Sequence, residues 1–190
     1  MENLDNVLPE QCQLQPLLPL VLNALERMLV SGEDLFCYRE VWCDGEPRRE
    51  GVSLRYSIIT LIGLIAAQKR GVELPKSLDI QRLVNRLKQE RAENLGDLGL
   101  MAWMLSWLGP NQNHIAVERL IALLPSAQPS ILESSDMMHL AWALTGLCYV
   151  YQASGGEARI KSLAEQAKAI MVKAFNPRSG LFYRCLLYTS

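Results

Sequence analysis

The sequence LGLMAWMLSWL at residues 98–108 decides the fold, because it is apolar on nearly every face of a helix. A helix that is apolar all round is normally a buried helix. Two further segments have the same character, namely LRYSIITLIGLIAA at residues 54–67 and MMHLAWALTGLCYVY at residues 137–151. The sequence therefore predicts three buried helices, around which the rest of the chain is arranged.

Each buried segment is followed by a break and then by an amphipathic segment. Gly71, Gly109 and Gly155 stand where the three buried helices are expected to end. Beyond them, apolar residues recur with the i, i+3, i+4, i+7 spacing of a helix that has one wet face. We expect helices near residues 14–30, 53–70, 78–92, 97–108, 114–124, 135–153 and 158–174.

The glycine breaks recur at intervals of roughly 40 residues, the period of stacked helical hairpins. Strand signals are nearly absent, and residues 33–51 have neither helical nor strand periodicity, so we interpret them as a long ordered loop. We therefore expect an all-α fold, a partial (α/α) toroid of about three and a half helical hairpins with parallel inner helices. An open solenoid is the alternative, and the strongly apolar inner helices favour the toroid.

The end of the chain differs from the rest. CLLYTS at residues 185–190 resembles translated adaptor sequence, and NPRSGLFY at residues 176–183 looks like the approach to another repeat. We interpret residues 1–184 as a single, incomplete helical-toroid domain and residues 185–190 as a non-native tail that makes few core contacts.

Composition excludes several classes of protein. The 19 basic and 20 acidic residues create no overall field for nucleic acid, and no apolar run is long enough to span a bilayer. The five cysteines are irregularly spaced, and the first residues lack an export signal, so a cytoplasmic protein with free thiols is expected. No motif for nucleotide, zinc-protease or serine-hydrolase chemistry is present, and we expect no cofactor and no metal.

Four segments carry a resemblance to a known family: SLRYSIITLIGL (53–64), GDLGLMAW (96–103), HLAWALTGL (139–147) and GLFYR (180–184). In these segments the chain resembles the VpsJ-type proteins of bacterial polysaccharide-biosynthesis clusters, which are similar in architecture to six-hairpin glycosidases. The resemblance implies a role in exopolysaccharide production, with a glycan or other polysaccharide-assembly proteins as partners. It does not assign a reaction, because fold analogy alone does not identify catalytic residues.

Polar residues near the starts of the buried helices are the candidate site. If the inner helices are parallel, these starts lie on one side, where a sugar could meet carboxylates and aromatic rings. The candidate catalytic residues are Asp97, Asp136 and His139, and the two carboxyl groups could flank a glycosidic bond. The candidate substrate-binding residues are Arg55, Tyr56, Trp103 and Trp142.

Each of these residues also has a structural interpretation. Asp97 and Asp136 could cap helices, His139 could be satisfied by Asp136, and the tryptophans could be core residues. Arg55 could pair with a structural carboxylate. The sequence thus leaves two functions open, a glycan-binding or glycan-processing protein, with hydrolase-like or lyase-like chemistry if it is an enzyme, and a non-catalytic helical scaffold for protein partners.

Overall fold

The structure is a computed structural model that describes residues 15–92, 94–109, 116–120 and 137–182. Its helices include α1 (Leu18–Met28), α2 (Leu54–Lys69), α3 (Ile80–Gln89), α4 (Leu95–Ser106), α7 (Met137–Ala153) and α8 (Ala158–Ala174). These lie where the periodicity predicts helices, with boundaries displaced by about four residues at most. Residues 116–120 are helical too, and the rest of the helix predicted over 114–124 lies outside the described residues. No helix in the described residues is long and apolar enough to cross a membrane.

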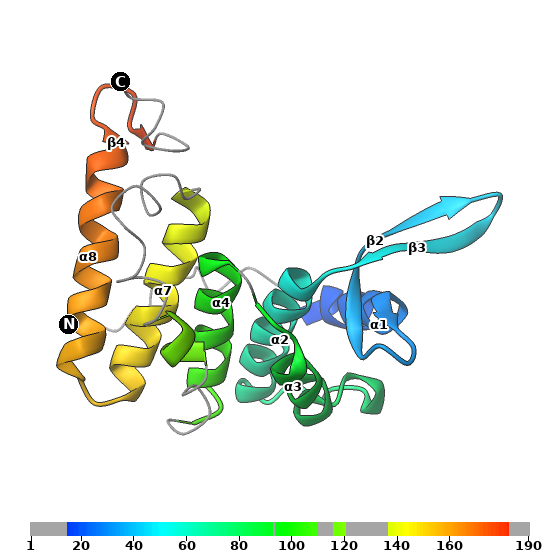
Figure 1. Cartoon of the computed structure of the whole chain (residues 1–190). Helices are drawn as coiled ribbons and strands as arrows, with labels where there is room; N and C mark the ends of the chain where they lie inside the picture. Colours follow the sequence, from blue (N-terminus) through cyan, green and yellow to red (C-terminus); the bar gives the residue numbers. More distant parts are fainter. Residues whose placement is uncertain (1–14, 93, 110–115, 121–136, 183–190) are drawn as a thin grey trace.

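The helices α8, α7, α4 and α2 stand side by side in that order, and α3 packs against α2 (Figure 1). Helices α4 and α7 run in the same direction. Near the start of both, Gly96 approaches His139, and further along both, Trp103 stacks on Tyr149 with 4.9 Å between ring centroids. Helix α3 buries one apolar stripe with i, i+3, i+4, i+7 spacing, as expected for a helix that covers a core. The stripe consists of Ile80, Leu83, Val84 and Leu87.

Helix α2 is parallel to α4 as well. Arg55 in the first turn of α2 pairs with Asp97 in the first turn of α4, and Lys69 at the far end of α2 lies over the ring of Trp107, just beyond the end of α4. The N-terminal ends of the three apolar helices α2, α4 and α7 are therefore gathered on one side. The apolar character of these three helices predicted this parallel arrangement.

Helices α4 and α7 are in backbone contact where they cross. A Cβ atom added to Gly99 would overlap the main chain at Ala143, and one added to Gly146 would overlap the carbonyl group of Gly99. Small residues at a crossing let two helix backbones approach more closely than larger side chains allow, and Cα–H···O contacts form at such separations. Leu98 and Leu140, both fully buried, lie in the same two helices and extend the contact into the core.

The prediction of an all-α, partial (α/α) toroid is wrong. Strands β1 (Leu29–Val30), β2 (Leu35–Cys43) and β3 (Glu46–Val52) form a three-stranded antiparallel sheet, and β4 (Phe175–Asn176) pairs with β5 (Leu181–Phe182). The part of the chain that the structure describes is mostly helical, with two small antiparallel sheets. The longer hairpin, β2–β3, projects from the helices as an arm (Figure 1).

The arm forms in the segment interpreted above as a loop, for reasons visible in the sequence. Asp44 and Gly45 link the strands, and both have positive φ angles, 53° and 84°. A two-residue turn of this kind suits the twist of a hairpin, and Asp-Gly is among its preferred sequences. Strand β2, LFCYREVWC, is rich in aromatic and β-branched residues, which favour strands. The arm lacks an alternating pattern because most of it is exposed on both faces.

The base of the arm is built into the core. Leu35, Phe36 and Cys37 are buried, and the main-chain N–H of Phe36 donates to Oγ of the buried Ser57 at 2.8 Å. The main-chain carbonyl of Phe36 accepts a hydrogen bond from the N–H of Ser53, the residue that caps α2. The arm is therefore held at a fixed angle to α2.

Replacing either crossing glycine by alanine should destabilise the protein severely. We expect Gly99→Ala and Gly146→Ala each to lower the free energy of unfolding by about 3 kcal/mol or more, because a methyl group forces the two backbones apart. Urea denaturation followed by circular dichroism measures the change. The matched control is Gly63→Ala in α2, where nothing lies within 4 Å of the added Cβ. That variant should gain up to about 1 kcal/mol, and equal stability of the Gly99→Ala and Gly63→Ala proteins would contradict the packing described here.

Candidate functional site

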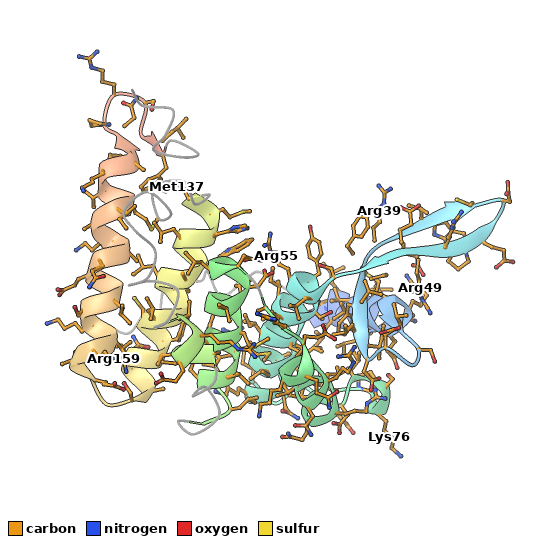
Figure 2. The ribbon with its side chains drawn as sticks, viewed as in Figure 1. Arg39, Arg49, Arg55, Lys76, Met137 and Arg159 are labelled. Carbon is orange, nitrogen blue, oxygen red and sulfur yellow. The ribbon has the colours of Figure 1, made fainter. Side chains whose placement is uncertain are left out.

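The gathered N-terminal ends of α2, α4 and α7 form the candidate site (Figure 2). Two local caps fix where these helices begin. The side chain of Ser53 accepts a hydrogen bond from the N–H of Tyr56 at the start of α2, and Asn94 does the same for the N–H of Asp97 at the start of α4. Arg55 and Asp97 thereby take fixed positions in the first turns of neighbouring helices.

Arg55 lies at the centre of the site. Its Nε donates to Oδ1 of Asp97 at 2.6 Å, and its Nη2 is 2.9 Å from Nε2 of His139. A guanidinium group has donors only, so Nε2 of His139 must be the acceptor in this contact. His139 then has its proton on Nδ1. The Arg55 side chain retains 27% of its exposure, so it is reachable from solvent.

Asp97 is buried and fully engaged. Its residue exposure is 7%, Oδ1 accepts from Arg55, and Oδ2 accepts from Nδ2 of Asn94 at 2.7 Å. Burying a carboxylate is costly unless it is paired and hydrogen-bonded, and here both oxygens have charged or polar donors. This geometry favours a positioning role for Asp97, in which it orients Arg55.

Trp142 provides an aromatic wall for the same site. The guanidinium carbon of Arg55 lies 4.8 Å from the centre of the indole ring, within the range of a cation–π contact. The ring of His139, one turn earlier on α7, lies 5.9 Å from that of Trp142. Both rings approach α4 at Gly96, where an added Cβ would lie 2.9 Å from atoms of each.

The structure brings together only some of the residues selected from the sequence. Arg55, Asp97, His139 and Trp142 are in contact as described above. Tyr56 is half exposed and follows Arg55 in α2, with no side-chain partner among the described residues. Asp136 lies outside the described residues, so the expected pair of carboxyl groups is not placed.

Trp103 lies elsewhere, further along α4. It stacks on Tyr149 and makes an edge contact with Trp107, with 5.7 Å between the centroids of the two indole rings. Its Nε1–H is buried and lacks a hydrogen-bond partner in the part of the chain that the structure describes. Trp103 thus belongs to a separate aromatic cluster, away from Arg55.

Two residues of the site were missed by the sequence analysis. Asn94 caps α4 and donates a hydrogen bond to Asp97. Gly96 has no side chain, so His139 and Trp142 can pack against α4 at this position. An asparagine directly before an apolar helix is a recognised capping signal and could have been found. The glycine could not, because its importance depends on which helix packs against it.

Two titratable groups outside the site, Cys37 and Arg39, have a structural explanation. Burial raises the pKa of the Cys37 thiol, which the positive charge of Arg49 only partly offsets, so Cys37 behaves as a packed apolar residue. Hydrogen bonding to Glu50 raises the pKa of Arg39 on the arm. Within the described residues, no three side chains of His, Cys, Asp or Glu are grouped as metal ligands.

The chain matches no protein-family model, no curated protein and no solved structure. The resemblance to VpsJ-type proteins therefore rests on the four sequence segments alone.

A double-mutant cycle measures how strongly the central pair ties α2 to α4. We expect Arg55→Met and Asp97→Leu to show a coupling energy of about 1 to 2 kcal/mol in urea denaturation, because both partners are largely shielded from water. The cycle of Arg27→Met with Glu40→Leu is the control, since Arg27 is 48% exposed. Its coupling should be on the order of 0.5 kcal/mol. Strictly additive effects of the Arg55 and Asp97 substitutions would show that the pair contributes nothing.

Proposed function

We propose that the protein binds an acidic glycan where the N-terminal ends of α2, α4 and α7 meet. The observation that carries this proposal is the placement of Arg55, which joins three side chains from two other helices and still reaches solvent. The guanidinium group therefore combines a fixed position with access from solvent.

The chemistry available at this site suits a sugar carboxylate. Nη1 of Arg55 and Nδ1–H of His139 have no partner among the described residues, so two donors remain for an incoming acceptor. Helix N-terminal ends add a positive potential that favours anions. Tyr56, half exposed in the same turn as Arg55, supplies a hydroxyl group for a further hydrogen bond.

The roles of the other residues follow from their contacts. Trp142 lies under the guanidinium group of Arg55, so its ring helps to hold that group in place. Asp97, with both oxygens engaged, holds Arg55 in place. The proposal is therefore one of binding, and glycan cleavage by Asp97, Asp136 and His139 stays a prediction that needs a second carboxyl group near the site.

The resemblance to VpsJ-type proteins supports a setting for this activity. We place the protein in bacterial exopolysaccharide biosynthesis, in the cytoplasm, where it would hold a uronate-containing glycan for other assembly proteins. A hydrogen bond to the carboxylate at Arg55 would distinguish such a glycan from its neutral counterpart.

A second function, a scaffold for protein partners, is supported by one observation. An open groove of about 730 Å³ lies between α1 and the connection from α2 to α3, and Leu18, Leu22 and Leu74 are among its lining residues. Leu20 and Val21 on the same helix are exposed. Apolar surface of this kind is typical of protein contact sites.

Replacing Arg55 by lysine tests the glycan proposal. Lysine keeps the positive charge but cannot donate two parallel hydrogen bonds to a carboxylate, as the planar guanidinium group can. We therefore expect Arg55→Lys to weaken binding of a galacturonic acid tetramer about ten-fold or more in titration calorimetry. Tyr56→Phe removes only an exposed hydroxyl group and should weaken binding a few-fold without a change in thermal stability.

The control is Arg39→Lys, an equally conservative change in an exposed ion pair of the arm. Its affinity for the tetramer should equal that of the wild type. The proposal fails if the wild-type chain does not bind the tetramer, or if Arg55→Lys and Tyr56→Phe both bind it with wild-type affinity.

A further inference from the structure

Helix α1 is apolar on two sides, and only one of them faces the core. It lies at the end of the row of helices furthest from α8 (Figure 1). The side chains that pack against the core are Leu22, Leu25 and Met28. A second series turns away from the core: Leu17 is 51% exposed, Leu20 67% and Val21 50%. A helix that serves only to cover a core has a polar outer face, so this second series needs an explanation of its own.

The exposed series forms one continuous stripe. Together with the partly exposed Ala24, its members follow the spacing i, i+3, i+4, i+7, which places side chains on one face of a helix. Leu17 precedes α1 but has helical backbone angles, φ −84° and ψ −19°, so the helical face includes it. We call Leu17, Leu20, Val21 and Ala24 the α1 stripe. No charged residue belongs to it.

The α1 stripe is complementary to itself when two copies run in opposite directions. If Leu20 of one copy lies opposite Val21 of the other, the antiparallel register also places Leu17 opposite Ala24. A large side chain then meets a small one at both ends of the contact, as interlocking helix faces require. A two-fold axis between Leu20 and Val21 produces this arrangement without any change of conformation.

We propose that the α1 stripe is the contact surface for a second copy of this chain, in a two-fold dimer with the α1 helices packed antiparallel. The formal net charge of −1 gives two copies little mutual repulsion. Two helices of this length bury less than the roughly 800 Å² on each partner that a standard interface has. The dimer is therefore weak, with a Kd on the order of 10 µM.

A membrane surface fits the α1 stripe less well. Helices that lie on membranes normally carry several lysines and arginines on their polar face. The one basic residue of α1 is Arg27, and it pairs with Glu40 of the arm at 3.2 Å. An unrelated protein would have to present the reverse series of large and small side chains, which a second copy supplies by symmetry.

Sedimentation velocity of the full chain between about 2 and 200 µM tests the dimer. We expect a monomer–dimer equilibrium in the wild type. Leu20→Glu places a charge at the centre of the contact and should weaken dimerisation about thirty-fold or more, with unchanged thermal stability. The matched control is Leu181→Glu, because Leu181 is also 67% exposed but lies in β5. This variant should dimerise like the wild type.

An exchange of side-chain size tests the antiparallel register. Leu17→Ala should weaken the dimer about five-fold or more, because it removes apolar contact area from both ends. Adding Ala24→Leu should restore most of the affinity, since the same pair of a large and a small side chain then forms with the places exchanged. A parallel pair would set residue 17 against residue 17 and would show no such recovery.

The dimer goes beyond the acidic-glycan proposal and does not rest on it, so Arg55→Lys should leave the dimerisation constant unchanged. A wild-type chain that is monomeric at about 200 µM would overturn the dimer. Wild-type dimerisation of Leu20→Glu, or no recovery on adding Ala24→Leu to Leu17→Ala, would also overturn it. Binding of phosphatidylserine vesicles by a monomeric wild type, lost in Leu20→Glu, would instead assign the α1 stripe to a membrane surface.

Discussion

The backbone contact between α4 and α7 at Gly99 and Gly146 is the constraint on which the rest of the structure depends. Because neither residue has a side chain at the crossing, the two helices lie close enough for main-chain atoms to touch. Their parallel directions then bring their first turns together. One turn before the crossing, Gly96 leaves room for His139 and Trp142, which could not approach α4 over a larger residue.

The electrostatic organisation of the site follows from this packing. With α7 held against α4, His139 and Trp142 lie beside Asp97, and Arg55 of α2 reaches all three. A buried carboxylate requires such partners, and Asn94 supplies the remaining hydrogen bond. The same contacts that satisfy Asp97 fix the direction of Arg55. Stability and the orientation of the binding group are therefore provided by one network.

The sequence predicted the helices well because continuous apolar runs and i, i+3, i+4 spacing are local signals of burial. It also predicted that Arg55, Asp97 and His139 would lie on one side, since this depended only on parallel directions of buried helices. The arm was missed because its strands are exposed on both faces and show no alternation, although Asp44-Gly45 is a hairpin signal. The contact at Gly96 and the separation of Trp103 from Arg55 depend on how α4 and α7 pack, which no local pattern specifies.

The tautomer of His139 tests the account most directly, because it depends on the placement of α7 against both α4 and α2. The chain has two histidines, so a long-range proton–nitrogen NMR spectrum of the protein with His114→Gln reports on His139 alone. The account predicts a neutral ring with the proton on Nδ1 and with Nε2 as the acceptor of a hydrogen bond from Arg55. A proton on Nε2 of the neutral ring would contradict it, since Arg55 could not then donate to that atom.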